Sequence, residues 1–246
     1  MELKNKVVLI TGSSSGIGQA TAKRFAQEGS KIVIHYHENE DGAKETQEEV
    51  KTYNVESIIV KADLSVEEDI KKLFETVVKE FGTVDILINN GASPTEFVPY
   101  FEAKQKDILD LFNLNIVNAM LCSKYAIDVM KKQKSGKIIN TSSIKGWEYG
   151  GGSVGYAVSK AAINSFTRTL AKSVAPEIQV NAVAPGYVKT RVYDNQPEEK
   201  IEKWLNGTYL KRWVTLEETA DAFVFLAKND AMTGQIIYVD GGYTLK

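Results

Sequence analysis

The first ninety residues repeat one pattern: a short run rich in Val and Ile, a turn of glycine or polar residues, and an amphipathic stretch with helical spacing. This repeat is typical of βαβ units and not of β-hairpins. Parallel strands need right-handed crossovers, which place helices on both faces of the sheet. We therefore predict an α/β fold, a single-domain doubly wound parallel sheet of about seven strands.

The pattern continues along the chain except between residues 185 and 215. The predicted strands are residues 6–11, 31–36, 57–61, 84–89, 137–143, 178–184 and 235–240. The predicted helices are residues 17–28, 41–53, 66–81, a stretch from Gly91 to about 132 with a break at 113–115, then 153–175, 198–205 and 216–228. A connection of roughly thirty residues is long for a compact domain. We therefore predict a substrate loop at about 187–214 within one domain spanning 1–246.

Charge and composition exclude several classes of partner. The chain carries 30 Lys+Arg and 32 Asp+Glu, a net charge of −2, so it has no global basic field for nucleic acid or anionic lipid. Its apolar runs fall far short of the ~20 residues of a membrane span, and its first six residues contain no apolar signal core. We expect a cytoplasmic protein with no nucleic-acid or membrane partner. With only Cys122, His35 and His37, no Cys/His zinc cluster can form, and no metal site is predicted.

A glycine-rich turn joins the first predicted strand to the first predicted helix. Gly12, Gly16 and Gly18 allow a tight turn, and they let a phosphate approach free N–H groups at a helix N-terminus. The spacing G-x-x-x-G-x-G differs from the dinucleotide fingerprint G-x-G-x-x-G. Taken alone, the glycines are also compatible with a turn that binds nothing.

A phenol and an ammonium stand four residues apart in a predicted helix. Tyr156 and Lys160 therefore lie on one face and can share a site. A nearby ammonium favours the phenolate, so we expect Lys160 to lower the pKa of Tyr156 toward the operating range. Ser143 ends the preceding strand at its carboxyl end, where open α/β sheets place their ligands. The Tyr–Lys spacing alone also occurs on solvated helix faces. The interpretation as a catalytic site therefore depends on the presence of Ser143 nearby.

At these positions the chain resembles the short-chain dehydrogenase/reductase family, nearly from end to end. The family's motifs are matched in order by Thr11, Gly12, Gly16 and Gly18, by Asp63, by Asn115, by Ser143 with Tyr156 and Lys160, by Asn181 to Gly186 with Thr190, and by residues 233–235 and 239–242. The resemblance implies a Rossmann fold and an oxidoreductase that interconverts a ketone and a secondary alcohol with NAD(P)(H).

The resemblance also implies the role of each site residue. Tyr156 exchanges a proton with the substrate oxygen, Ser143 orients the carbonyl, Lys160 tunes Tyr156 and holds the nicotinamide ribose, and Asn115 holds a water that links Lys160 to solvent. The implied cofactor contacts are Gly12, Ser14, Ser15, Gly16, Ile17, Gly18, Tyr36, His37, Asp63, Leu64, Asn90, Gly91, Tyr156, Lys160, Pro185, Gly186, Val188 and Thr190.

One family motif is matched imperfectly. Family members usually read Asn-Asn-Ala-Gly after the fourth strand, whereas this chain reads Asn-Asn-Gly-Ala at residues 89–92. We expect the ribose-side contact near Asn90 to be kept, while the substitution leaves the backbone course past Gly91 open.

The end of the second strand decides between NAD and NADP, because an acid there binds the ribose 2′-hydroxyl and repels a 2′-phosphate. Tyr36 occupies that position, so NADP(H) is favoured and NAD(H) stays possible. His37 is placed to meet the phosphate, and Ser14, Ser15 and Asn39 add hydrogen bonds. The competing interpretation is that both histidines, and His35 in particular, are simply solvent-exposed residues at the end of a strand.

The substrate is expected to meet residues 94–101, 145–153 and 187–214, which offer as candidate walls Phe97, Trp147, Tyr149, Tyr187, Tyr193 and Trp204. Such aromatics are more often packing residues. Lys145, Lys189 and Arg191 are candidates for holding an anionic group. The pattern looks most like the 3-oxoacyl-carrier-protein reductases, with sugar and secondary-alcohol dehydrogenases as the alternative.

Two further questions remain open at the level of sequence. Lys134 and Lys172 match the carrier-protein-binding cations only loosely, which weakens the acyl-carrier interpretation. A non-catalytic dinucleotide-binding regulatory protein is the alternative from another class, although such relatives typically lose Ser, Tyr or Lys from the site. The resemblance implies a homotetramer formed through residues 115–132 and 153–175 and the last strand.

Overall fold

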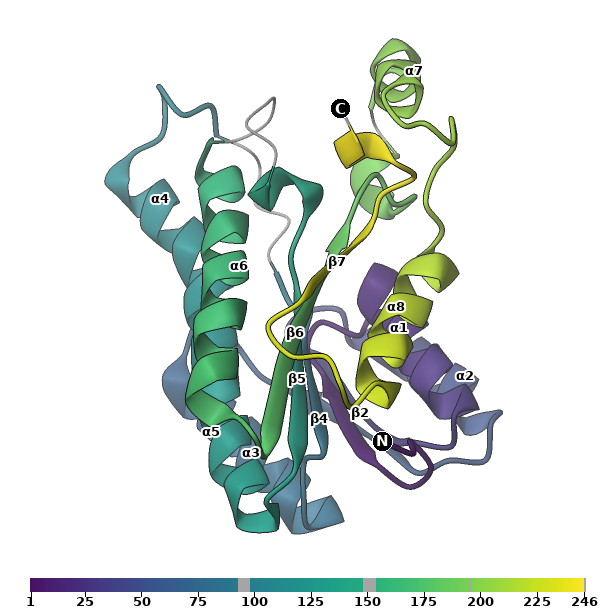
Figure 1. The fold of residues 1–246 in the computed structure, drawn as a ribbon, viewed down its shortest axis with the longest axis vertical. Helices are drawn as coiled ribbons and strands as arrows, with labels where there is room; N and C mark the ends of the chain where they lie inside the picture. Colours follow the sequence, from purple (N-terminus) through teal and green to yellow (C-terminus); the bar gives the residue numbers. More distant parts are fainter. Residues whose placement is uncertain (93–97, 148–153, 195, 246) are drawn as a thin grey trace.

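Seven parallel strands form one sheet with helices on both faces, as predicted (Figure 1). The computed structural model describes residues 1–92, 98–147, 154–194 and 196–245. The strands are β1 (Val7–Ile10), β2 (Lys31–Tyr36), β3 (Ser57–Lys61), β4 (Ile86–Asn89), β5 (Gly136–Thr141), β6 (Ile178–Pro185) and β7 (Ile236–Val239). The helices are α1 (Gly16–Gln27), α2 (Glu40–Lys51), α3 (Glu67–Phe81), α4 (Gln105–Phe112), α5 (Asn118–Gln133), α6 (Val154–Val174), α7 (Glu198–Asn206) and α8 (Leu216–Lys228).

The strand order is β3-β2-β1-β4-β5-β6-β7. The chain moves outward from β1 to β3, then returns to place β4 on the other side of β1. The direction of winding therefore reverses between β1 and β4. In open α/β sheets, ligands bind outside the carboxyl ends of the strands at this point.

Alternating side chains of the buried strands divide the core into two layers. In β1, Val7 and Leu9 face one layer, while Val8 and Ile10 face the other. The first layer is closed by α3, α5 and α6, and the second by α1, α2 and α8 (Figure 1). A strand buried on both sides reads as a continuous apolar run, which is why the strands were recognisable.

The long helical stretch after Gly91 differs from its prediction in two ways. The helix begins only at Gln105. The predicted break at residues 113–115 falls where the α-helical pattern is interrupted, but the chain stays helical there and continues from α4 to α5 through a π-helical segment, Asn113–Val117. One residue more per turn shifts the helix face without ending the helix, and such π-bulges are frequent at functional sites.

Two short regular segments lie at the edge of the predicted substrate loop. Helix α7 forms where residues 198–205 were predicted to be helical. Val188 and Val214 pair in an isolated parallel bridge, which closes the base of the loop between them. Among the described residues, no helix combines the length and apolar character that a membrane crossing requires.

Candidate active site

The turn between β1 and α1 is shaped by close backbone contacts. Gly12 has a φ of +63°, and a Cβ built there would lie 2.8 Å from the Cα of Gly91. A Cβ on Gly18 would lie 2.3 Å from the carbonyl oxygen of Gly12. Helix α1 follows Ser15, whose side chain forms no capping hydrogen bond. The first N–H groups of α1 are therefore left for another acceptor, and an anionic diphosphate fits that requirement.

The β4 side of this turn is held by hydrogen bonds. The Thr11 hydroxyl accepts from the N–H groups of Asn90 and Gly91 at 2.9 and 2.8 Å. The Asn90 amide donates to the carbonyl oxygens of Thr11 and Gly12 at 3.0 and 3.2 Å. Gly91 also fits tightly, since a Cβ there would be 3.1 Å from Leu64 Cδ1. The Asn-Gly order therefore keeps the backbone against the glycine turn.

The end of β2 reverses one expectation. His35 is 3 % exposed, so its interpretation as a solvated strand end is wrong. Its Nδ1 accepts from the N–H of Gly12 at 2.9 Å, and its Nε2 lies 3.1 Å from the carbonyl oxygen of Ala62. The ring thus connects the glycine turn to the segment after β3. Burial lowers the pKa of His35 to about 4.

The other polar side chains near β2 already have partners. The Tyr36 phenol is hydrogen-bonded to Glu40, and burial together with that carboxylate raises the phenol's pKa. His37 Nε2 lies 3.7 Å from Asp63 Oδ2. The Asn39 side chain, expected to reach a phosphate, instead donates to the carbonyl oxygen of Ser14 and accepts from the start of α2.

Ser143, Tyr156 and Lys160 come together at the carboxyl end of β5. Ser143 lies two residues beyond the strand and is hydrogen-bonded to the Tyr156 phenol. Lys160 is 4 % exposed, and its Nζ donates to the carbonyl oxygen of Thr141 at 2.9 Å. The same ammonium lies 5.6 Å from the centroid of the Tyr156 ring. A hydroxyl, a phenol and an ammonium therefore form one group, in which Ser143 and Lys160 are buried and Tyr156 is half-buried.

Burial controls the protonation of this group. Burial raises the pKa of Tyr156, and the hydrogen bond with Ser143 opposes the change without reversing it. The net shift of the Tyr156 pKa is thus upward, whereas a lowering by the Lys160 ammonium was expected. Burial also lowers the pKa of Lys160 to about 8. The neutral phenol is the favoured form, which suits a proton donor to a carbonyl oxygen.

Asn115 lies in the π-helical segment beside α6. Its side chain is 3 % exposed, and its Nδ2 lies 3.2 Å from the hydroxyl of Ser159. Ser159 in turn donates to the carbonyl oxygen of Tyr156 at 2.8 Å. Asn115 Oδ1 is buried and has no hydrogen-bond partner among the described residues. Such an atom is suited to hold an ordered water.

The segment after β6 returns to the glycine turn. A Cβ on Gly186 would lie 2.7 Å from Asp240 Cα, so Gly186 allows this segment to pass close to the end of β7. Val188 is buried. The methyl group of Thr190 lies 3.9 Å from the position of a Cβ on Gly16. Thr190 and the start of α1 are therefore neighbours, as a shared cofactor site requires.

The predicted substrate loop packs around a cluster of aromatic rings. Tyr187 stacks on Trp204 with a centroid distance of 5.3 Å, and Tyr193 contacts Trp204 and Trp213 at 5.3 and 5.0 Å. Tyr243 meets Tyr187 edge-on at 5.2 Å. Trp213 and Tyr243 were not anticipated, because no spacing in the sequence connects them with the others.

The remaining candidates for the substrate walls are scattered. Trp147 is 60 % exposed and contacts Tyr238. Lys145 lies over the rings of Tyr187 and Tyr243, at 5.9 and 5.4 Å. Phe97, Tyr149 and their neighbours at 93–97 and 148–153 lie outside the described residues.

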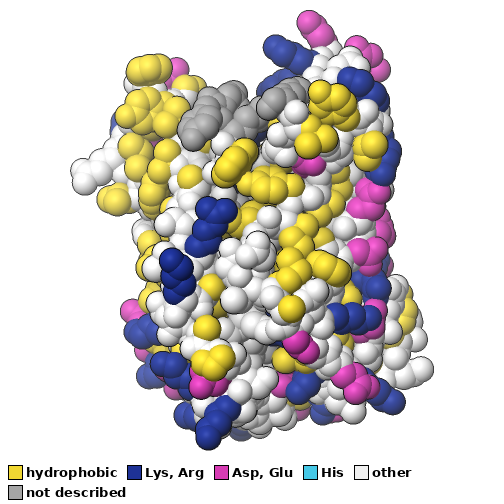
Figure 2. Space-filling model, in the orientation of Figure 1, with side chains coloured by type: hydrophobic (Ala, Val, Ile, Leu, Met, Phe, Trp, Pro, Cys, Tyr) yellow, Lys and Arg dark blue, Asp and Glu magenta, His cyan; other side chains and the backbone are white. Residues whose placement is uncertain are grey.

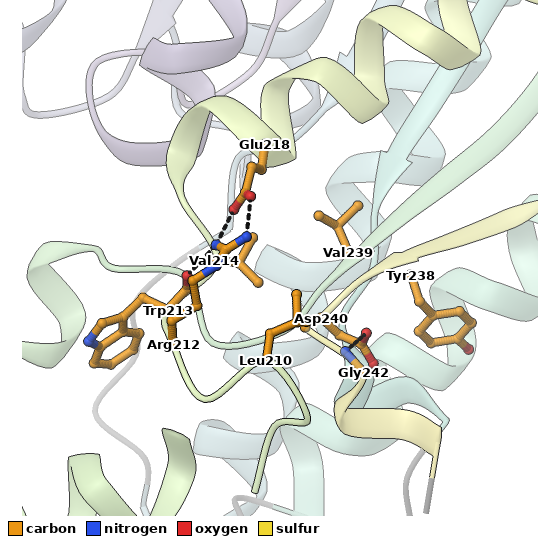
Figure 3. A pocket seen from close by; sticks show the side chains of 10 residues that line it. Leu210, Arg212, Trp213, Val214, Glu218, Tyr238, Val239, Asp240 and Gly242 are labelled. Atoms are coloured by element: carbon orange, nitrogen blue, oxygen red, sulfur yellow. Dashed lines mark hydrogen bonds and ion pairs between the residues drawn. The ribbon is translucent and has the colours of Figure 1, made fainter. Parts of the chain in front are cut away.

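A separate cavity of about 390 Å³ lies between the end of the substrate loop and β7 (Figure 3). Arg212 and Glu218 face each other in it through two hydrogen bonds of 2.9 and 2.6 Å. The Asp240 carboxylate accepts from Gly242 and Thr244. None of the predicted site residues lines this cavity, and its carboxylates are already paired.

Comparison with known proteins agrees with this architecture. The family model described as enoyl-(acyl carrier protein) reductase matches residues 12–244. The chain is 36% identical to glucose 1-dehydrogenase 2 of Bacillus subtilis over 250 residues, covering 99% of this chain and 96% of that protein. It is 35% identical to a 3-oxoacyl-[acyl-carrier-protein] reductase of Synechocystis over 247 residues, covering 99% and 98%.

A solved structure extends the comparison to the fold. A double mutant of a Serratia marcescens short-chain dehydrogenase/reductase superposes with a TM-score of 0.92 at 29% identity, covering 99% of this chain and 100% of that one. The fold and these relatives define an oxidoreductase built on a doubly wound sheet. The chain belongs to the short-chain dehydrogenase/reductase family, whose members use NAD(P)(H).

Proposed function

We propose that this chain is a ketoreductase that converts a 3-oxoacyl thioester to the 3-hydroxy compound with NADP(H), and that NAD(H) is its weaker cofactor. The observation that carries the proposal is the group formed by Ser143, Tyr156 and Lys160 at the carboxyl end of β5. The glycine turn lies at the carboxyl end of β1, beside the point where the strand order reverses. The two sites thus share one edge of the sheet.

Each side chain has a role that follows from its state. The Ser143 hydroxyl donates a hydrogen bond to the substrate carbonyl oxygen and stabilises the charge that develops there. The Tyr156 phenol, kept neutral by burial, donates its proton to the same oxygen. Lys160 holds the ribose hydroxyls, and a water on Asn115 Oδ1 returns a proton toward Tyr156. The bound dinucleotide supplies the hydride.

The glycine turn and the start of α1 are proposed to hold the diphosphate of the cofactor. The contacts come from Ser14, Ser15, Ile17 and the glycines 12, 16 and 18, with Thr190 on the opposite side. Asp63 and Leu64 border the adenosine end, and Pro185, Gly186 and Val188 border the nicotinamide end. Asn90 and Gly91 support the turn through Thr11.

The preference for NADP(H) rests on the end of β2. Tyr36 stands where an acid would bind the ribose 2′-hydroxyl and repel a phosphate. Glu40 lies close by, but it is paired with Lys44 at 2.7 Å. His37, whose Nε2 lies 3.7 Å from Asp63 Oδ2, is proposed to meet a 2′-phosphate. Titration of the purified protein with NADPH and NADH separately tests the preference, and a much tighter NADH would reverse it.

Sugar oxidation is the second candidate, because a glucose dehydrogenase is among the similar proteins. A screen separates the candidates: NADPH and NADH oxidation with 3-oxoacyl thioesters, diketones and ketoses, against NADP⁺ and NAD⁺ reduction with glucose and secondary alcohols. We expect the highest kcat/KM with a 3-oxoacyl thioester. Dinucleotide binding without turnover of any substrate would favour a regulatory protein instead.

A homotetramer is proposed as the working assembly. Helices α5 and α6 expose Met120 and Val158, each by nearly half of its surface. Strand β7 is the edge of the sheet, and hydrophobic side chains gather over it (Figure 2). Both surfaces are suited to pair with a second copy. Size-exclusion chromatography with light scattering tests this proposal, and a monomer at micromolar concentration would contradict it.

A further inference from the structure

His35 holds two segments that border the proposed cofactor site. Gly12 belongs to the glycine turn after β1, and Ala62 immediately precedes Asp63 after β3. The ring of His35 lies between them on β2, with contacts of 2.9 Å to Gly12 N and 3.1 Å to Ala62 O. One buried side chain therefore connects the carboxyl ends of three adjacent strands.

The two contacts require one form of the ring. The N–H of Gly12 donates to Nδ1, so Nδ1 carries a lone pair and the proton resides on Nε2. That Nε2–H donates to the carbonyl oxygen of Ala62. A doubly protonated ring would place an N–H against the N–H of Gly12. Burial is the main cause that lowers the pKa of the ring, and His37 acts in the same direction. The hydrogen bond to Ala62 and the Asp63 carboxylate favour the charged ring, but burial outweighs them and keeps the ring neutral.

The backbone of His35 reinforces the same contact. The N–H of His35 donates to the Ser13 hydroxyl at 3.0 Å, and the N–H of Ser13 donates to the carbonyl oxygen of His35 at 3.0 Å. Ser13 also accepts from the Thr46 hydroxyl through its carbonyl oxygen at 3.0 Å. The turn is thus anchored to β2 at Ser13 by the His35 backbone, while the N–H of Gly12 is held by the imidazole.

The hydrogen bond to Gly12 matters because this residue adopts a left-handed conformation. With φ at +63°, its N–H points toward β2 while its carbonyl oxygen meets the amide of Asn90. Without an acceptor at Nδ1, the partly buried N–H of Gly12 would lose its partner, and the turn would relax to satisfy it. Such a relaxation displaces the N–H groups at the start of α1.

We propose that His35 is a positioning residue for dinucleotide binding, acting through its Nδ1 acceptor on the glycine turn. The inference rests on the proposed function of that turn. His35 is proposed to contact the turn and not the cofactor itself. The turn is proposed to hold the diphosphate, which NADPH and NADH share, so His35 should affect the affinity for both. The two cofactors are therefore expected to weaken by the same factor.

Two substitutions separate the two ring nitrogens. In His35→Asn the side-chain oxygen takes the place of Nδ1 and keeps an acceptor for Gly12, while the partner of Ala62 is lost. In His35→Gln the terminal amide takes the place of Nε2 and keeps a donor for Ala62, while the acceptor for Gly12 is lost. Val50→Ala is the control, because it removes a fully buried side chain of α2 without touching the turn.

The experiment measures the Kd of NADPH and of NADH by nicotinamide fluorescence, together with the thermal unfolding of each variant. We expect His35→Gln to weaken both cofactors about tenfold, as loss of one buried hydrogen bond predicts. We expect His35→Asn to stay within about threefold of the parent. The kcat at saturating cofactor should change little in either variant.

Three results would overturn the proposal. Equal binding by His35→Gln and the parent would show that the Nδ1 contact has no influence on the site. Equal weakening in both His35 variants, or weakening in Val50→Ala that follows its lower unfolding temperature, would show a general loss of stability instead. Failure of the parent chain to bind either dinucleotide would instead refute the proposed function.

Discussion

The cofactor side and the substrate side of this molecule are held in place by different forces. The turn after β1 is fixed by hydrogen bonds from three neighbouring segments, through His35, Asn39 and Asn90. The loop after β6 is fixed by aromatic packing among Tyr187, Tyr193 and Trp204. Hydrogen bonds fix direction and distance, whereas ring packing tolerates changes of shape. The first region is thus suited to one invariant ligand, and the second to a substrate that differs among relatives.

The reactive group between these two regions gives the largest expected effect. Tyr156→Phe removes the proton donor and keeps the ring that packs beside Lys160. We expect kcat to fall about 10³-fold or more, while the Kd of NADPH stays within about twofold. Steady-state kinetics and nicotinamide fluorescence measure the two quantities. Substantial remaining turnover would mean that another group supplies the proton.

Acid treatment distinguishes the two regions through their titratable groups. The folded chain holds His35 with a pKa of about 4, below the unfolded value of 6.5. Between these values the unfolded state binds the extra proton, so the free energy of unfolding rises with pH from about 4 to 6.5. The difference between the folded and unfolded pKa values of His35 corresponds to roughly 3 kcal/mol of unfolding free energy. Urea unfolding at several pH values should show this slope in the parent and its loss in His35→Asn.

On the substrate side, the stability contribution of Glu218 changes in a lower pH range than that of His35. Hydrogen bonds from Arg212 lower the pKa of Glu218 to about 2, so its contribution is present above the unfolded value of 4.5 and is lost as the pH falls toward 2. Glu218 is partly exposed, so solvent screening keeps this contribution small. The difference in unfolding free energy between the parent and Arg212→Ala can be measured against pH. If below pH 4 it changed as steeply as the His35 contribution does between pH 4 and 6.5, this ranking of the two regions would be contradicted.

The sequence predicted the cofactor side more fully than the substrate side, for a physical reason. Tight turns and parallel strands place their constraints on consecutive residues, so Gly12, Gly16 and Gly18 were recognisable from their spacing. The ring partners of His35 lie beyond the ends of two other strands, β1 and β3, and a strand-end histidine carries no sign that its neighbours will bury it. The family resemblance, and not periodicity, pointed to Asn115, whose π-helical segment lies where a break in the helix was expected.

The aromatic cluster shows the same limit. Tyr187, Tyr193 and Trp204 were recognised as candidate walls, with packing as the more common role. The structure adds Trp213 and Tyr243, which reach the cluster from the end of the loop and from the last turn of the chain. Only the return of β7 beside β6 brings Tyr243 there. Contacts made by distant segments leave no local signal.

Removing one ring of that cluster tests whether its effect stays on the substrate side. Trp204→Ala should cost about 2 kcal/mol of packing, and it should raise KM for the carbonyl substrate more than it changes the Kd of NADPH. Trp147→Ala is the matched control, because Trp147 is 60 % exposed and packs against Tyr238 only at its edge. If Trp204→Ala weakened NADPH as much as the substrate, the two regions would not be energetically separate.

The smallest expected effect comes from Asn39, which connects α2 to the glycine turn. Its side chain caps α2 by accepting from Gly42 N at 3.1 Å, and it donates to Ser14 O at 3.0 Å. Asn39→Ala loses both contacts and should lower the free energy of unfolding by about 1 kcal/mol. Asn39→Ser keeps a cap acceptor but cannot reach Ser14, so it should recover stability and still bind NADPH about twofold more weakly. Full recovery of both quantities in Asn39→Ser would show that the contact with Ser14 adds nothing, and that the cofactor side depends on fewer hydrogen bonds than the comparison implies.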